Sequence, residues 1–201
     1  MKAKVTLFLP LTFVFVLLKP INTSCNETGY PLVTNYNSVT YNAHPQNWNI
    51  IQDDRGFMYF ANGDGVFVYD GSTWELVELP NKVPARVFAK DNQGIIYTAG
   101  PNEFGYLKPN NLGKLEYVSL IDSIGLNDIG IVREIFNING ILYVRTEEYV
   151  IKVASSEFTH WKAKSVFNIS FVFNNELFVL DNEFGLYKLV NDSLTLAPSG
   201  K

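Results

Sequence analysis

The chain has little of the chemistry that most enzymes and metalloproteins need, with one cysteine and two histidines among its 201 residues. A single cysteine excludes an intrachain disulfide framework and a zinc site built from several cysteines. Basic charge is also scarce, because 16 basic against 20 acidic residues leave a net charge of −4 and an isoelectric point near 5.2. Since phosphate binding favours a basic surface, we expect no nucleic-acid partner.

Catalytic and metal-binding motifs are missing as well. The sequence has no G-x-S-x-G elbow, H-E-x-x-H pair, Walker loop or EF-hand. The carboxylate pair Asp53–Asp54 falls in a turn, and the glycine-rich stretch 62–65 lacks the alternating oxygen ligands of a calcium loop. His44, beside a proline, and His160, in an expected outer strand, are interpreted as structural. The chain is therefore poorly equipped for catalysis, and we expect no cofactor and no metal site.

Aromatic and turn-forming residues are abundant instead. The chain has 15 phenylalanines, 11 tyrosines, 3 tryptophans and 21 asparagines, with 47% hydrophobic and 18% charged residues. This composition is too hydrophobic for a disordered chain and indicates one folded domain, or one and a half. Because asparagine favours turns, the combination predicts many short strands.

The first 24 residues are predicted to be a signal peptide. Lys2 and Lys4 precede fourteen uncharged residues, Val5–Leu18, a run too short for a membrane-spanning helix. We expect an exported, periplasmic chain that begins between residues 22 and 27. Removal of residues 1–24 takes three lysines, so 13 basic against 20 acidic residues leave −7. Cys25 allows a lipoprotein interpretation, which Asn22 disfavours; the alternative is an incidental cysteine.

A repeat of about 40 residues runs through the rest of the chain. Gly56, Gly94 and Gly140 each precede an apolar-aromatic run, and Asn175 takes the glycine's place in a fourth copy. The spacings are 38, 46 and 35 residues. The matching aromatic residues are Tyr59, Tyr97, Tyr143 and Phe178. In the first copy, Asn-Gly and Asp-Gly pairs flanked by alternating apolar residues predict hairpins and a four-stranded unit.

Tandem four-stranded antiparallel units of this length predict an all-β fold, a β-propeller with about four blades present. The expected blades are residues 47–80, 85–120, 131–165 and 166–197. Residues 121–130 are an insertion in which we expect a helical turn. Residues 25–46 form a lead-in segment, and residues 47–201 a partial β-propeller.

The segment from Val33 to Trp48, continued by Asp53–Phe60 and Gly65–Gly71, resembles the exported sensor regions of bacterial two-component regulators. Asn102–Leu107 and its partial echo Asn182–Tyr187 belong to the same resemblance, which covers about residues 30–200. The resemblance implies a propeller that precedes a triple-tyrosine immunoglobulin-like module, a membrane helix and a cytoplasmic output domain. Such propellers commonly have seven blades.

Four blades against seven indicate an incomplete seven-bladed propeller whose remaining blades lie downstream. There are two alternatives. The chain closes as a four-bladed ring, or it pairs with a second copy of itself or with another chain. An open row of blades exposes apolar surface at its ends. We therefore expect Phe171, Phe173 and Phe178 to be poorly shielded on one side.

A polar rim is the candidate ligand-binding site. Alternating strand direction places the turns between second and third strands on one face, together with the connections between blades. These turns carry Asn62, Asp64, Asn102, Glu103, Glu147, Glu148, Asn182 and Glu183. Amides and carboxylates beside tryptophan and tyrosine suit sugar hydroxyls and sugar rings. The alternative is that these residues only form turns.

The resemblance implies an exported, non-catalytic sensor module that binds an extracellular glycan or another small ligand. One alternative is a propeller enzyme acting on polysaccharide, with Glu103, Glu148 and Glu183 as candidate carboxylates. The other is a protein-interaction scaffold that docks a partner at its open edges.

Overall fold

Antiparallel strands make up most of the regular structure in the described part of the chain. The structure, a computed structural model, describes residues 32–155, 157–198 and 200. The expected signal peptide and Cys25 lie outside these residues. The chain divides between Asn35 and Tyr36, and all described strands belong to the second unit, Tyr36–Lys201. None of the described helices is long and apolar enough to cross a membrane.

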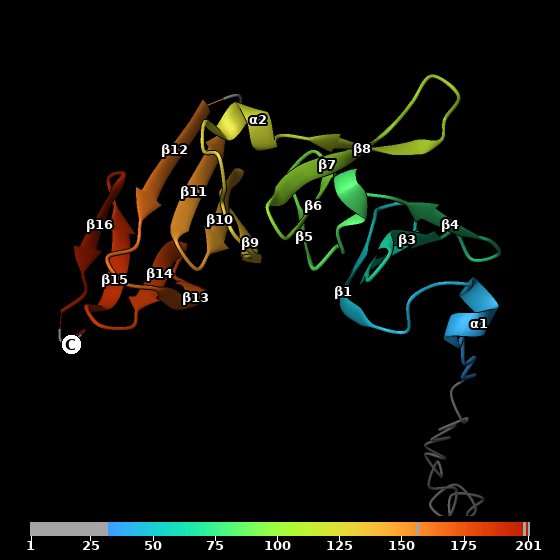
Figure 1. Cartoon of the computed structure of the whole chain (residues 1–201), viewed down its shortest axis with the longest axis horizontal. Helices are drawn as coiled ribbons and strands as arrows, with labels where there is room; N and C mark the ends of the chain where they lie inside the picture. Colours follow the sequence, from blue (N-terminus) through green and yellow to red (C-terminus); the bar gives the residue numbers. More distant parts are fainter. Residues whose placement is uncertain (1–31, 156, 199, 201) are drawn as a thin grey trace, which may run out of the picture. The chain divides into compact units, whose positions relative to one another are not determined.

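The strands form four four-stranded sheets, each from one continuous stretch of chain (Figure 1). The first contains β1 (Asn47–Gln52), β2 (Met58–Asn62), β3 (Gly65–Tyr69) and β4 (Trp74–Val77). The second contains β5 (Val87–Lys90), β6 (Ile96–Gly100), β7 (Glu103–Pro109) and β8 (Leu115–Ser119). The third contains β9 (Val132–Ile138), β10 (Ile141–Thr146), β11 (Tyr149–Ala154) and β12 (Glu157–Lys162). The fourth contains β13 (Phe167–Phe173), β14 (Glu176–Asp181), β15 (Gly185–Val190) and β16 (Ser193–Leu196).

Within each sheet the strands pair in chain order, which is the topology of a propeller blade. The innermost strands of neighbouring sheets, β1 with β5 and β5 with β9, contact one another. In Figure 1 the first and fourth sheets lie at opposite ends of the row, as in an incomplete propeller. The predicted fold class, an all-β chain with four four-stranded blades, is confirmed.

The repeated Asp…Gly element forms the turn between the first two strands of a blade. The Asp53 carboxylate accepts hydrogen bonds from the backbone N–H groups of Arg55 and Phe57, both at 2.9 Å. Gly56 closes this turn with a φ of 92°, which glycine adopts at little cost. In the second blade, the Asp91 carboxylate accepts from Gln93 and Ile95 in the same way. The repeat that is visible in the sequence therefore encodes turn geometry.

Among the residues that the structure describes, three short helical segments lie outside the strands. The first is α1 (Ser38–Tyr41), the second is the 3₁₀ turn η2 (Pro80–Lys82), and the third is α2 (Ile121–Ile124). Only α2 falls in the stretch where we expected a helical turn. The Asn37 side chain caps α1 by accepting a hydrogen bond from the Thr40 N–H at 2.9 Å, and η2 begins at a proline. Both missed segments thus have local causes.

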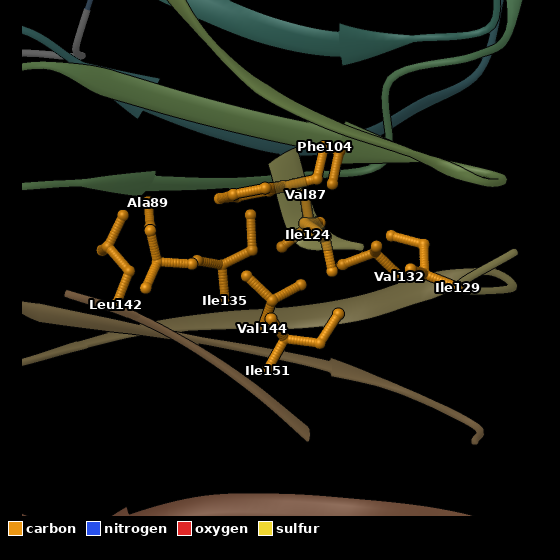
Figure 2. Close-up of a cluster of buried hydrophobic side chains, with 12 residues drawn as sticks. Val87, Ala89, Phe104, Ile124, Ile129, Val132, Ile135, Leu142, Val144 and Ile151 are labelled. Atoms are coloured by element: carbon orange, nitrogen blue, oxygen red, sulfur yellow. The ribbon is translucent and has the colours of Figure 1, made fainter. Parts of the chain in front are cut away.

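Apolar side chains fill the spaces between neighbouring sheets. Figure 2 shows the cluster between the second and third sheets, where Phe104 and Val87 face Ile135 and Val144, with Ile124 of α2 beside them. A second cluster joins the first and second sheets, and a third joins the third and fourth. The core is therefore a series of layers between blades.

The two outward-facing sheet surfaces differ in their covering. On the first sheet, Trp74 lies 5.4 Å from Tyr36 and 5.3 Å from Tyr41 between ring centroids, so the lead-in segment covers this surface. On the fourth sheet, Phe171 and Phe173 are exposed, and the rings of Phe171 and Phe178 stack at 5.3 Å. Phe178 is half-buried. The prediction of poor shielding is confirmed for Phe171 and Phe173 but not for Phe178, on which the Phe171 ring stacks.

Candidate functional site

The predicted rim is a continuous strip of turns and inter-blade connections, called the turn face below. It comprises the β2–β3, β6–β7, β10–β11 and β14–β15 turns and the connections β4–β5, β8–β9 and β12–β13. Backbone hydrogen bonds join the two kinds of segment. Ala85 N–H donates to the Asn62 carbonyl at 3.1 Å, and Asn102 N–H donates to the Gly130 carbonyl at 2.8 Å. The turns and connections therefore lie at the same edge of the sheets, as expected.

In the first blade, Asn62 and Asp64 hold the lead-in segment. The Asn62 side-chain amide is buried and donates to the His44 carbonyl at 2.7 Å, the Gln46 carbonyl at 3.1 Å and Asn47 Oδ1 at 2.8 Å. The Asp64 carboxylate accepts from the His44 N–H at 2.8 Å. Asn62 is therefore committed to contacts within the protein, whereas the side chain of Asp64 is exposed.

Asn102 and Glu103 of the second blade also bond to the protein. Asn102 Oδ1 accepts from the Ile129 N–H at 2.9 Å and so fixes the connection to the third blade. Glu103 is 5% exposed, and its carboxylate accepts from the Tyr117 hydroxyl at 2.9 Å and the Ser119 hydroxyl at 2.6 Å. Burial and the nearby Glu103 carboxylate raise the pKa of Tyr117 above its ordinary value. Both residues stabilise the blade.

The predicted residues of the third and fourth blades are exposed. Glu147 pairs with Arg133 at 2.6 Å, and Glu148 lies 3.8 Å from Lys162. The Asn182 and Glu183 side chains make no hydrogen bond within the described residues, although their backbone N–H groups bond to the Val166 carbonyl and the Ser165 hydroxyl. These four residues border one connection, residues 163–166, whereas the pairs in the first two blades lie on other connections.

A groove of about 400 Å³ opens between the third and fourth sheets beside this connection. It is lined by His160, Trp161, Lys162, Lys164, Phe167, Asp181, Tyr187, Ser193 and Leu194, and is called the 3–4 groove below. Its volume falls in the range of small-molecule sites, which combine apolar walls with a few polar groups. Sequence reasoning missed these residues as a site, because β12 and β15 meet only after the sheets pack.

Charge distinguishes the 3–4 groove from two other cavities. The cavity between the first two sheets contains Asp53, which pairs with Arg55 at 2.7 Å. The cavity on the opposite edge of the third and fourth sheets contains Lys152, which pairs with Asp192 at 2.6 Å. In the 3–4 groove, Lys164 has no carboxylate oxygen within 4.0 Å among the described residues, and its ammonium lies 5.5 Å from the Tyr187 ring centroid. The groove therefore has a donor available for a ligand.

Asp181 forms the buried floor of this groove. Its carboxylate accepts from the Lys164 N–H at 2.9 Å, from the Ser165 N–H at 3.1 Å and from the Ser165 hydroxyl. Burial alone would raise the pKa of Asp181, but the hydrogen bonds from Ser165, Glu183 and Lys164 outweigh it and hold the pKa below its ordinary value of 3.8. Asp181 ends β14 as Asn62 ends β2, so the repeat register could have identified it.

Replacement of Asp181 by asparagine should lower the free energy of unfolding by about 2 kcal/mol at neutral pH, because an amide NH₂ would meet buried N–H donors. Because the pKa of Asp181 is lowered in the folded protein, its carboxylate stabilises the fold at pH values above the ordinary carboxyl pKa. This contribution to the free energy of unfolding disappears as the pH falls through the lowered pKa. Urea unfolding across an acid series should therefore show the two proteins converging. The exposed Asn182→Ala is the control, and equal losses for both variants would contradict the assigned role.

Comparisons with known proteins identify the fold. No protein-family model matches the chain, and no curated protein matches it. Virginiamycin B lyase from Staphylococcus aureus is similar in structure, with a TM-score of 0.55 and 14% identity over 73% of this chain and 53% of the lyase. The chain thus spans about half the length of that enzyme. At this identity the likeness shows the fold alone.

Extracellular domains of bacterial signalling proteins are among the other structural neighbours. One is assigned to a hybrid two-component system from B. thetaiotaomicron, with a TM-score of 0.56 and 15% identity over 72% of this chain and 22% of that one. Another, from a one-component system of B. thetaiotaomicron, has a TM-score of 0.54 and 15% identity over 74% and 21%. The chain spans about a fifth of each domain, and the likeness is again one of fold.

Proposed function

We propose that the chain is an exported, non-catalytic sensor module of a two-component signalling protein that binds an extracellular oligosaccharide or another small ligand. The 3–4 groove is the observation that carries ligand binding. The shared fold with extracellular domains of signalling proteins supports a sensing role. The basic start and short apolar run of residues 1–18 support export to the periplasm.

The groove has the chemistry that a sugar requires. Half-buried Trp161 and Tyr187 offer ring surfaces on which the C–H face of a sugar stacks. Lys162, Lys164 and Ser193 supply donors for hydroxyl oxygens from three different segments. Trp161 is fixed because its ring N–H donates to the Asp192 carbonyl at 3.1 Å. A ring held in place loses little entropy when a ligand binds.

Binding in this groove would link two blades. Trp161 and Lys162 belong to β12 of the third sheet, whereas Tyr187 and Ser193 belong to the fourth. A ligand that contacts both sheets favours the arrangement in which they are packed together.

The positions of the carboxylates support a binding role over catalysis. Glu103 is buried beneath Tyr117 and Ser119, so it does not reach a substrate. Glu148 and Glu183 extend from different sheets, and Glu148 lies near Lys162. Glycoside hydrolysis usually needs two carboxyl groups that flank one bond.

Titration of the purified chain with neutral oligosaccharides, measured by calorimetry, tests this function. Trp161→Ala should weaken binding about tenfold or more, because the stacking surface is lost. Trp74→Phe, on the outward face of the first sheet, should leave the affinity unchanged. Retained affinity in Trp161→Ala would contradict the groove as the site. Product formation, monitored by chromatography of the same mixtures, would contradict the non-catalytic role.

A further inference from the structure

A second constellation lies on the turn face between the first and second sheets, and it consists of His44, Trp48 and Arg86 (the Arg86 cluster). The guanidinium carbon of Arg86 is 4.5 Å from the centroid of the Trp48 ring. The His44 ring lies nearly parallel to Trp48, with an interplanar angle of 16° and centroids 6.4 Å apart. The three residues come from the lead-in segment, β1 and the connection before β5, so only the folded chain brings them together.

Several contacts hold this cluster in place. The buried Asn62 amide and the Asp64 carboxylate bind the backbone of the His44 segment. Gly63 allows the close approach of His44, because a Cβ at this position would lie 2.4 Å from His44 Cγ. The pairing of β1 with β2 shifts register between Asn47 and Asn49, and such a bulge re-aims the side chain between them, here Trp48.

Arg86 is short of partners in this setting. Its Nε is buried and has no hydrogen-bond partner, and no carboxylate oxygen lies within 4.0 Å of its guanidinium among residues 32–155, 157–198 and 200. Arg86 as a whole is half-buried, whereas the buried Arg145 is paired with Glu134. Stacking on Trp48 occupies the flat face of a guanidinium, but its N–H donors point outward in the plane. The terminal Nη groups of Arg86 also make no hydrogen bond among the described residues and are not buried, so they are the donors open to a ligand.

We propose that the Arg86 cluster binds an oxyanion, a carboxylate, sulfate or phosphate group of a small ligand. The planar guanidinium matches the two oxygens of such a group in a bidentate arrangement. Trp48, which is 37% exposed, offers apolar surface beside Arg86 for the body of the ligand. His44 and Asn62 are positioning residues that hold the indole and the lead-in segment. Asp64, the carboxylate closest to the cluster in sequence, is engaged by the His44 N–H.

The Arg86 cluster lies between the first and second sheets, whereas the 3–4 groove lies between the third and fourth. The proposal for the cluster therefore does not depend on the function proposed for the groove. The oxyanion has two sources, a free inorganic ion or an acidic sugar, which share the same chemistry at Arg86. Sulfate and phosphate represent the first source, and trigalacturonate the second. Maltotriose is a neutral sugar of matched length. Binding is measured by tryptophan fluorescence and calorimetry at constant ionic strength, with the full chain and its Trp161→Ala variant.

We expect at least one anionic probe to bind saturably, with an affinity that Trp161→Ala does not change. Maltotriose should not bind to the Trp161→Ala variant. Arg86→Gln should lower the affinity for the anionic probe at least tenfold. Arg86→Lys should lower this affinity too, because lysine keeps the charge but lacks the planar pair of donors. Arg133→Gln is the matched control. It removes a positive charge near the start of β9, where Arg133 already pairs with Glu147, and should change the affinity less than twofold.

Three results would overturn the site. The first is no saturable binding of any anionic probe below about 10 mM. The second is equal weakening by Arg86→Gln and Arg133→Gln, which would mean that only net charge matters. The third is unchanged affinity in Arg86→Lys and Arg86→Gln. Far-UV circular dichroism establishes that each variant is folded; if Arg86→Gln is not, Arg86→Lys decides the question.

Discussion

Replacement of Phe104 by alanine should lower the free energy of unfolding by about 3–5 kcal/mol, the cost of a large cavity in a close-packed core. Phe104 is 0% exposed and lies in the cluster between the second and third sheets (Figure 2). Its ring also stacks on Tyr97, with centroids 5.9 Å apart. Chemical denaturation followed by circular dichroism measures the loss.

The matched control is Phe173→Ala, the same chemical change at a side chain that is 60% exposed on the outward face of the fourth sheet. We expect a loss of about 0.5 kcal/mol or less, as for most surface substitutions. A loss close to that of Phe104→Ala would contradict the open fourth-sheet face described above. The pair therefore tests the layered core and the uncovered end of the row together.

Arg145→Ala should also be destabilising, by about 2–4 kcal/mol, because it removes a buried guanidinium and leaves the Glu134 carboxylate, whose side chain is 34% exposed, without its cation. Arg145 is 4% exposed and donates to the Glu134 carboxylate at 2.8 Å and 3.1 Å. It also donates to the Ser170 hydroxyl at 3.2 Å and the Phe167 carbonyl at 3.3 Å. These bonds join the third sheet to the fourth.

Arg133→Ala provides the comparison, since Arg133 forms an exposed pair with Glu147 on the same sheet. Exposed pairs contribute about 0–1 kcal/mol, so this variant should melt within a few degrees of the parent. Thermal unfolding of both variants at two salt concentrations measures the difference. If the two arginine variants lose equal stability, the bonds from Arg145 to Ser170 and Phe167 do not hold the two sheets together.

The blade architecture could be predicted from sequence because its determinants are local. Asp53 and Gly56 lie three residues apart, and their turn needs no information from elsewhere in the chain. The cap of α1 by Asn37 is an equally local signal, but it lies in the lead-in segment, where we expected no helix. The repeat pattern therefore predicts the strands and their turns but not the two short helical segments α1 and η2.

The roles of the rim residues could not be predicted, because they depend on contacts between distant segments. Asn62 bonds to His44 across 18 residues, and Asn102 bonds to Ile129 across 27. Glu103 reaches Ser119 of β8 only because β7 and β8 pair in one register. The turn face itself was predictable from strand alternation, but which of its side chains remain available to a ligand was not.

The succession of the sheets in chain order has a consequence for biosynthesis. Every sheet is complete within one uninterrupted stretch, so most pairings join residues close in sequence, which favours rapid folding. As the nascent chain leaves the ribosome, residues 36–77 contain all that the first sheet and its aromatic cover require. Each later sheet then meets an apolar surface already formed by its predecessor. Only the most recently formed sheet then presents uncovered apolar surface, so the surface prone to aggregation during synthesis is limited to that sheet.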